Sequence, residues 1–444
     1  MTGEAIFSVH DLERHYSVTR GLFRREVGRV RAVDGISFDL ERGETLALVG
    51  ESGCGKSTAA RTLVGLEDPT GGTVRFDGTD VTTADGRAAT DFRRRVGMVF
   101  QDPDSSFNPR MPVGEAVGEP LRIHGMRDEQ RERAIVTELL ELVGLSEAHY
   151  DRYPHEFSGG QKQRLALARA LVLDPEVVVA DEPVSALDKR VQDDVLDLMA
   201  DLQERFDLSI LFISHDVDVV RSFCDRVAVM YLGELVERGP VETVFEEPAH
   251  PYTRALLGSV PALDPGDRGE LVTLTGEVGD PADPPTGCRF HPRCPAVIPS
   301  PEYDLPREEW RALLDLRFAV ADAADADEDL RTGDRSLRED HGVPAPLSDP
   351  DAEAVLERAL ADVADGTVER GARQLSEEFT TICKEKNPRR ETSTADRLPA
   401  ISTSTDSPRS ERATSSQRRS RSSGCRPVRR VSSPKRSPSR EGFW

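Results

Sequence analysis

Near the start of the chain, four residues have the types and spacing of a loop that cradles phosphates. Gly50, Gly55, Lys56 and Ser57 fit the pattern G-x-x-x-x-G-K-[ST], between a short apolar strand and a helix. Glycines let backbone N–H groups turn toward a phosphate, and the helix directs its positive dipole end to the same place. Lysine would reach the phosphates, and the serine hydroxyl would bind Mg²⁺. The alternative is an accidental glycine-rich turn. The loop residues expected to contact a nucleotide are Gly50, Glu51, Ser52, Gly53, Cys54, Gly55, Lys56, Ser57 and Thr58.

Other polar residues stand where apolar stretches end. Asp181 and Glu182 close one such stretch, and Gln101 and His215 each follow another. The carboxyl ends of parallel strands are where α/β sheets bind ligands. Asp181 suits Mg²⁺ because hard cations take oxygen ligands, and Glu182 suits the polarisation of an attacking water. A lone histidine is usually structural, but we expect His215, at a strand end, to contact the γ-phosphate.

A second glycine-rich stretch precedes a later helix. Ser158, Gly159, Gly160 and Gln161 combine a capping serine with two glycines, which makes an anion site at a helix N-terminus. The alternative is an ordinary helix cap. Two phosphate sites in one domain are explained if the second serves the nucleotide of another subunit.

Strand and helix patterns alternate around these residues. Strands are predicted at residues 35–40, 45–49, 95–100, 177–182 and 209–213, and helices at 113–145 and 162–173. Tyr16, in the opening strands, is a candidate to stack on adenine, although an aromatic on a strand is more often a core residue. The helix after Asp188 is expected to bury Val191, Val195, Leu198, Met199 and Leu202.

Composition limits the class of protein. The 444 residues suffice for two or three domains, and 37% of them are hydrophobic. No apolar run reaches about 18 residues and no leader is seen, which favours a cytoplasmic protein. Six cysteines make no disulfide framework. The net charge is −22, and only six of the 58 basic residues are Lys. This acidic surface predicts a halophile, whose molar salt screens charges over about 3 Å.

Taken in order, these motifs resemble the nucleotide-binding subunits of ABC transporters over about residues 5–295. The loop at 49–58, the Phe157–Arg164 stretch and the His250-Pro-Tyr-Thr-Arg run are similar to the oligopeptide/dipeptide importer branch. Residues 16–33 and the Ser105–Arg110 run are similar to the "F" member of its paired ATPases. The resemblance implies an α/β P-loop ABC ATPase domain with a parallel-sheet core, an antiparallel β subdomain, a helical subdomain and a C-terminal extension. The expected domains are the ATPase at 5–247, with its helical subdomain at about 102–157, the extension with an acidic insert at 248–388, and a disordered basic tail at 389–444.

The resemblance also implies a mechanism. Two such ATPase subunits would close head to tail, with each ATP between one phosphate loop and the Ser158–Gln161 stretch of the other subunit. The implied roles are phosphate and Mg²⁺ binding by Lys56 and Ser57, completion of the metal site by Asp181 and Gln101, base catalysis by Glu182, γ-phosphate sensing by His215, adenine stacking by Tyr16 and a link between sites at Asp188. The implied partners are a second ATPase subunit, identical or not, two membrane permease subunits and, indirectly, an extracellular solute-binding protein. No nucleic-acid partner is expected.

Cysteines near the C-terminus raise a second question. Cys288 and Cys294 lie where the peptide-importer branch often carries a cysteine cluster, bound to an iron–sulfur centre in some members. A third cysteine is missing nearby, but Cys383 lies in a stretch that resembles the end of this motif, after the acidic insert. Cys425 remains as a fourth ligand, and thiolates favour zinc or iron–sulfur. Reduced, unliganded thiols are favoured, because three thiolates leave a four-ligand site incomplete.

The composition inverts after residue 388. Residues 389–444 hold 14 Lys or Arg against five Asp or Glu, with Ser-Arg-Pro repeats. Such a segment is typical of disorder, and a basic tail could bind nucleic acid or anionic lipid. We interpret it instead as a disordered or frame-shifted tail without function.

Together these patterns predict a peripheral ATPase at the cytoplasmic face of the cell membrane that energises import of oligopeptides or dipeptides. The alternatives are import of nickel or an oligosaccharide, a soluble ABC ATPase outside transport, and a P-loop kinase. The single motif set and the His250-Pro-Tyr extension favour transport, and a kinase leaves the Ser158–Gln161 stretch unexplained.

Overall fold

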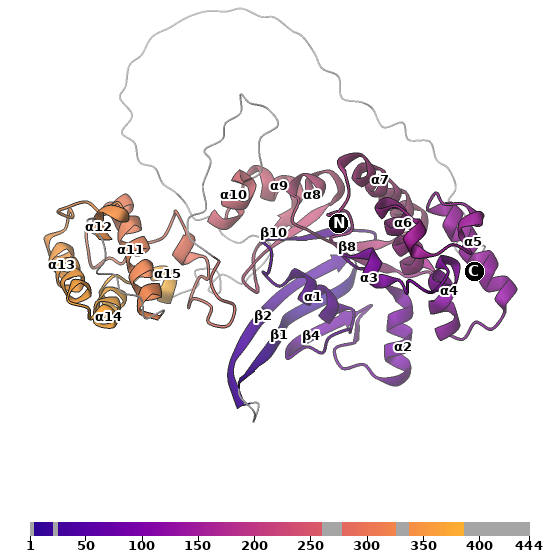
Figure 1. Ribbon diagram of the computed structural model, residues 1–444, viewed down its shortest axis with the longest axis horizontal. Coiled ribbons are helices and arrows are strands. Elements are labelled where there is room, and N and C mark those ends of the chain that lie inside the picture. Colours follow the sequence, from indigo (N-terminus) through magenta and orange to yellow (C-terminus); the bar gives the residue numbers. More distant parts are fainter. Residues whose placement is uncertain (1–3, 21–24, 260–277, 326–336, 386–444) are drawn as a thin grey trace, which may run out of the picture. The chain divides into compact units, whose positions relative to one another are not determined.

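The computed structural model of the protein describes residues 4–20, 25–259, 278–325 and 337–385 (Figure 1). Two β-sheets form within these ranges, one of six strands and one of four. None of the helices in these ranges has both the length and the apolar composition needed to cross a membrane. The tail predicted at 389–444, Cys425 and part of the predicted extension lie outside the described residues.

The six-stranded sheet has the order β10-β9-β3-β8-β7-β6. Its strands are β3 (Thr45–Val49), β6 (Val96–Val99), β7 (Val177–Asp181), β8 (Ser209–Ser214), β9 (Arg226–Tyr231) and β10 (Glu234–Pro240). All pairs are parallel except β9 with β10. Every residue of β3, β7 and β8 is buried. Continuous apolar runs therefore form these strands, as in parallel sheets covered on both faces, and the strands predicted in this region are confirmed.

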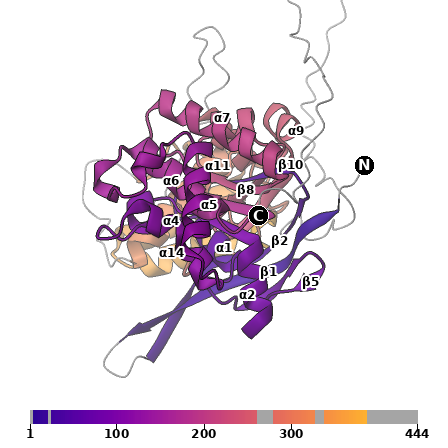
Figure 2. The same cartoon turned by 90° about the vertical axis from the view of Figure 1, so that its right-hand side faces the viewer.

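The four-stranded sheet is antiparallel and has the order β2-β1-β4-β5. Its strands are β1 (Ala5–Arg20), β2 (Arg25–Glu41), β4 (Gly71–Phe76) and β5 (Thr79–Asp80). Ile36, Phe38 and Leu40 alternate along β2 and are buried, as the period of two predicts. Figure 2 shows β1 and β2 continuing as a long hairpin past the part of β1 that pairs with β4. The predicted antiparallel subdomain is present.

Helices follow strands of both sheets, mostly those of the large sheet. They are α1 (Lys56–Leu63), α2 (Gly86–Arg95), α3 (Pro103–Ser106), α4 (Val113–Ile123), α5 (Glu129–Leu142), α6 (Gly159–Leu171), α7 (Lys189–Phe206), α8 (Val217–Phe223) and α9 (Val241–Glu246), with short 3₁₀ turns η1 (Glu147–His149) and η2 (Pro154–Glu156). The predicted helical stretch at 113–145 is two helices, because Asp128 caps a new helix.

The buried face of α7 differs in part from the prediction. Val195, Met199 and Leu202 are buried as expected, whereas Val191 and Leu198 are only partly buried and Leu196 lies in the interior instead. At about 100° per residue, the buried positions 192, 195, 196, 199 and 202 span an arc centred close to Met199, and positions 191 and 198 lie just beyond one edge of that arc. The predictions that Val191 and Leu198 are buried were therefore wrong.

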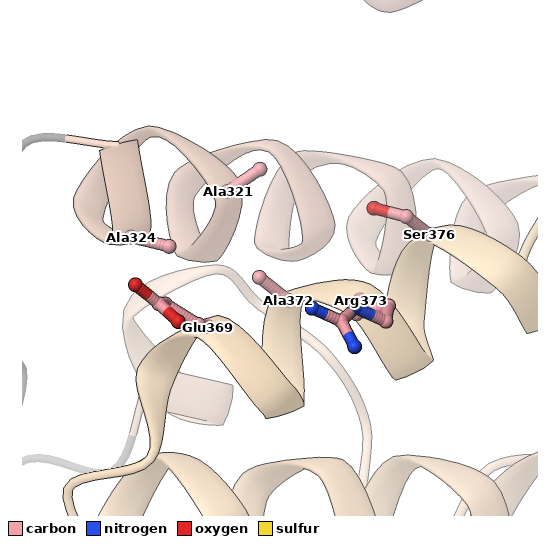
Figure 3. A pocket seen from close by; sticks show the side chains of 6 residues that line it. All are labelled: Ala321, Ala324, Glu369, Ala372, Arg373 and Ser376. Atoms are coloured by element: carbon pink, nitrogen blue, oxygen red, sulfur yellow. The ribbon is translucent and has the colours of Figure 1, made fainter.

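Residues after 250 form further helices. They are α10 (Pro251–Gly258), η3 (His291–Arg293), α11 (Arg307–Asp325), α12 (Leu337–Asp340), α13 (Pro350–Ala364), α14 (Val368–Glu378) and α15 (Ile382–Glu385). Trp310, Leu356, Leu375 and Phe379 are fully buried, so α11, α13 and α14 share an apolar core. A hollow of about 280 Å³ lies between α11 and α14. Figure 3 shows the residues that line it, with Ala321 and Ala324 on α11 and Glu369, Ala372, Arg373 and Ser376 on α14.

Candidate active site

The phosphate-loop pattern lies between β3 and α1, as predicted. Lys56 is 5% exposed, and its Nζ donates to the carbonyl oxygens of Gly50 at 2.8 Å and Glu51 at 3.0 Å. Gly55 has a φ of 110°, and a Cβ there would lie 1.9 Å from the carbonyl oxygen of Ala32. Glycine is required at Gly55 on both counts. The turn thus holds the lysine ammonium among backbone groups at the start of a helix.

Next to this loop a buried carboxylate meets the first turn of α1. The Ser57 hydroxyl donates to Asp181 Oδ1 at 3.0 Å, and Asp181 is 1% exposed. Burial raises the pKa of Asp181 above its usual range, the bond from Ser57 opposes the rise, and the charge of Glu182 adds to it. Because β3 and β7 are separated by β8 alone, the sheet order itself brings these two residues together.

Glu182 lies where β7 ends, in a left-handed backbone conformation with φ of 47°. This conformation is uncommon for a residue with a side chain, and it turns the chain out of the strand. Glu182 Oε2 accepts a hydrogen bond from Gln101 Nε2 at 3.0 Å and lies 3.2 Å from His215 Nδ1. Three residues that follow β6, β7 and β8 therefore meet at one carboxylate, as their strand-end positions predict.

The oxygen set at this edge fits a hard divalent cation. Ser57 and Asp181 present a hydroxyl and a carboxylate 3.0 Å apart, and both are ligand types that Mg²⁺ takes. Gln101 also carries an amide oxygen at the same edge of the sheet. These residues would hold Mg²⁺, which would supply charge neutralisation at the phosphates.

The second glycine-rich stretch caps α6. Ser158 Oγ accepts from the backbone N–H of Gln161 at 3.4 Å, and the Gln161 side chain accepts from the N–H of Ser158 at 3.0 Å. Ser158 and Gly159 are exposed. A Cβ on Gly160 would lie 2.4 Å from Val191 Cγ1, so α6 and the start of α7 approach closely there. The predicted anion site is thus a capping box that opens to solvent.

Two other predicted site residues have contacts of their own. Asp188 caps α7 by accepting from the N–H of Val191 at 3.1 Å, and it is exposed. Tyr16 on β1 donates its hydroxyl to Glu67, and the Arg14 guanidinium lies 4.6 Å from its ring centroid. The tyrosine is partly buried, so its ring packs on the arginine in the structure.

The three described C-terminal cysteines lie near one another, since the charges of Cys288 and Cys383 contribute to the raised pKa of Cys294. The backbone N–H of Cys288 donates to the carbonyl oxygen of Cys383, with an N···O distance of 2.8 Å. No group of three or more His, Cys, Asp or Glu side chains within the described ranges is placed to hold a metal ion. Burial raises the pKa of Cys288 to about 11 and that of Cys294 to about 12, which favours thiols over thiolates. The geometry does not fit an iron–sulfur centre.

Sequence reasoning missed one group of contacts. Glu51 was expected to contact a nucleotide, but its carboxylate forms a two-pronged pair with Arg293, with distances of 2.8 and 3.1 Å. The backbone N–H of Glu51 donates to the Tyr252 hydroxyl at 2.9 Å. No local signal connects residues about 200 and 240 positions apart.

Comparison with known proteins covers most of the chain. Residues 33–185 match the family model "ABC transporter", residues 236–300 match "Oligopeptide/dipeptide transporter, C-terminal region", and residues 307–396 match a domain of unknown function. The helices α11 to α15 therefore fall within a separately recognised segment.

Two relatives are similar over nearly their whole length. The "Dipeptide transport ATP-binding protein DppF" of Escherichia coli (strain K12) is 51% identical over 284 residues, 64% of this chain and 85% of the relative. The "Oligopeptide transport ATP-binding protein AppF" of Bacillus subtilis (strain 168) is 48% identical over 308 residues, 68% and 93% of the two chains. A solved dimeric ATP-binding cassette bound to ADP and Pi is 28% identical, with a TM-score of 0.48, over 53% of this chain and 98% of that chain.

A phosphate loop beside strand-end carboxylates, on a parallel sheet joined to an antiparallel one, defines an ABC-type ATPase. The C-terminal match and the relatives narrow this class to one family. The chain belongs to the ATP-binding subunits of the dipeptide/oligopeptide ABC transporter family.

Proposed function

We propose that this ATPase energises import of oligopeptides or dipeptides across the cell membrane. The observation that carries the proposal is the joint match to an ATPase and to a peptide-transporter C-terminal region. About half of the aligned residues are identical to those of relatives named for dipeptide and oligopeptide transport. The site residues of this chain are suited to ATP hydrolysis and not to recognition of the transported solute.

In the proposed reaction, Lys56 and the loop N–H groups bind the β- and γ-phosphates. Ser57, Asp181 and Gln101 would hold the metal ion. Glu182 accepts a proton from the attacking water, and its contacts with Gln101 and His215 fix its orientation. His215, whose side chain is 56% exposed, is accessible to the γ-phosphate. Tyr16 would stack on adenine after Arg14 moves from its ring.

The exposed Ser158–Gln161 stretch supports a pairing of two ATPase subunits. A helix N-terminus with a serine hydroxyl and bare glycine backbone binds phosphate well, yet this one faces solvent. It would complete the ATP site of a second subunit, and Asp188 would lie between the two sites. That second subunit would be another copy of this chain or a different ATPase chain, according to which ATPase subunits the transporter contains.

Within the transporter, the helical segment after Gln101 would contact the permease subunits. Lys162 and Arg169 of α6 bond to Asp104 and to Ser106 of α3, so the helix of the Ser158 stretch is fixed to the chain just after Gln101. Closure on ATP at the cytoplasmic face would therefore move this segment as a unit and open the path for the solute. An extracellular solute-binding protein would deliver that solute.

The test is uptake of labelled dipeptides, oligopeptides, nickel and oligosaccharides in cells whose only copy carries Glu182→Gln. Loss of peptide uptake alone is expected. Intact peptide uptake with loss of nickel or sugar uptake would reassign the solute and keep the ATPase mechanism. Uptake of all four at wild-type rates, with no permease copurifying, would favour an ABC ATPase outside transport.

At the cysteines, the raised thiol pKa values and the lack of a metal-binding group among the described residues support the unliganded state over a zinc or iron–sulfur site. The test is iron, sulfide and zinc analysis of the full chain purified without oxygen. Metal at less than about a tenth of the protein concentration is expected; near-stoichiometric iron with sulfide would establish the cluster.

A further inference from the structure

Glu51, in the phosphate loop, is held at each of its polar groups. Its carbonyl oxygen accepts from Lys56 Nζ at 3.0 Å. Its N–H donates to the Tyr252 hydroxyl at 2.9 Å, and its carboxylate receives both terminal nitrogens of Arg293. Lysine is the phosphate-binding group, and the other two partners come from the segment after residue 247. One loop residue thus joins this C-terminal segment to the lysine.

The two C-terminal partners are themselves fixed. Tyr252 packs against Tyr231 and Phe290, with ring centroids 4.6 and 5.3 Å away, and all three rings are at most 1% exposed. Arg293 is 7% exposed and lies next to the Tyr231 hydroxyl. Rotamers locked by packing make such groups effective at positioning a neighbour.

The negative charge of Glu51 explains why its ion pair with Arg293 matters for ATP binding. A carboxylate within a loop that binds a triphosphate repels the ligand unless a cation neutralises it. Arg293 supplies that cation in a bidentate geometry, the strongest arrangement for an arginine–carboxylate pair. Arg289, four residues earlier, pairs with Asp34 and lies 3.3 Å from Glu234, which anchors the same segment to β2 and β10.

We propose that Arg293 and Tyr252 are positioning residues for ATP: they neutralise and orient Glu51 so that Lys56 and the loop backbone meet the phosphates. The C-terminal segment is then part of the ATPase and not only an attachment to it. The proposal rests on the assignment of Lys56 to the ATP phosphates.

The test measures ATP affinity in the full chain, with Mg·ATP as the probe and thermal unfolding in parallel. Arg293→Gln is expected to weaken ATP binding about tenfold, because it leaves a carboxylate uncompensated in the loop. Glu51→Gln/Arg293→Gln should recover most of that loss, since the repelling charge is gone. Tyr252→Phe, which loses one hydrogen bond, should cost about threefold. Arg338→Gln breaks an ion pair with Glu353 in the C-terminal helices and is the matched control, expected to bind ATP as the wild type does.

Three outcomes separate the explanations. If Arg293→Gln binds ATP within twofold of Arg338→Gln, or if the double variant is as weak as Arg293→Gln, the proposal is overturned. If Arg293→Gln does not fold, Glu51→Gln decides: affinity equal to or tighter than wild type supports the charge argument, and a tenfold loss refutes it. Lys56→Ala tests the underlying site. Normal ATP affinity in that variant would remove the assignment of the loop itself, whereas lost affinity there with an unaffected Arg293→Gln would remove only the role of Arg293.

Discussion

At the phosphate loop, Lys56 is buried and bonded to two carbonyl groups, Ser57 is bonded to Asp181, and Glu51 is held by residues far along the chain. At the Ser158 stretch, the serine and the first glycine are exposed, and the polar groups bond within their own capping box. Both are helix N-termini suited to phosphate. The first is built by the fold of this chain, whereas the second is completed, in our proposal, by a second subunit.

The largest effect on turnover should come from the part of the site around the phosphate loop, which this chain forms by itself. Glu182→Gln keeps the shape of the side chain but removes the proton acceptor, so turnover should fall about 10² to 10⁴-fold while ATP binding persists. Phosphate release and nucleotide affinity measure the two separately. Glu204→Gln, on the exposed side of α7, is the matched control. Near-normal hydrolysis in Glu182→Gln would refute the assignment of the base.

A change in the exposed Ser158–Gln161 stretch should leave the fold and the ATP affinity of the isolated chain unchanged. In Gly159→Asp, the nearest atom to the new Cβ is a Leu187 methyl at 3.5 Å, so the helix tolerates the side chain. ATP affinity of the isolated chain should stay within about twofold, because the site in cis is unchanged. Hydrolysis by the assembled transporter should fall about 10²-fold, because an added carboxylate repels the phosphates of the partner's nucleotide. Gly28→Asp, at an exposed glycine of β2, is the control. Equal losses in the isolated and assembled forms would contradict a site completed in trans.

A milder version distinguishes capping from phosphate binding. Ser158→Ala and Asp128→Ala each remove a helix cap, at a cost of about 1 kcal/mol in the free energy of unfolding. Only the serine also faces the proposed trans nucleotide, so only Ser158→Ala should lower hydrolysis by the transporter, about tenfold for a lost bond to a charged group. If both variants lower hydrolysis to the same extent, Ser158 is a cap and nothing more.

The smallest effect concerns stability and pH. The pKa of Asp181 is raised in the folded chain, chiefly by burial, so its charge costs stability once the pH exceeds its ordinary value, and the cost is fully present above the folded pKa. Asp181→Asn should therefore raise Tm at neutral pH without nucleotide, although it lowers Mg²⁺-dependent turnover. The Tm difference should shrink as the pH falls through the folded pKa. A lower Tm for Asp181→Asn at pH 7 would mean that the bond from Ser57 outweighs burial.

Much of this arrangement follows from local sequence. Apolar runs predict β3, β7 and β8, and polar residues at their ends predict the meeting of Asp181, Glu182 and His215, because parallel strands end at one edge. The helix cap at Ser158 is likewise predicted by the four residues Ser158–Gln161. The roles of these residues, and the domain limits, stay predictions.

Contacts between residues far apart in the sequence, and the choice of which side chains pack together, could not be predicted. The pair between Glu51 and Arg293 depends on where the chain returns after β10, which no periodicity encodes. Tyr16 could not be placed against Arg14 because alternate residues of a strand give a shared face, not a contact. Leu198 and Leu196 are equally apolar, and only the packing of α7 decides between them.

The strand order of the large sheet also bears on how the chain acquires its structure during synthesis. The antiparallel β1–β2 hairpin pairs neighbours in the sequence and can form soon after it leaves the ribosome. β3 pairs instead with β8 and β9, so the strand that carries the phosphate loop waits for roughly 160 further residues before it has a partner. A ribosome stalled before β8 therefore holds a nascent chain with its first hairpin formed and its ATP-binding edge still unassembled, and that interval is when the apolar β3 most needs a chaperone.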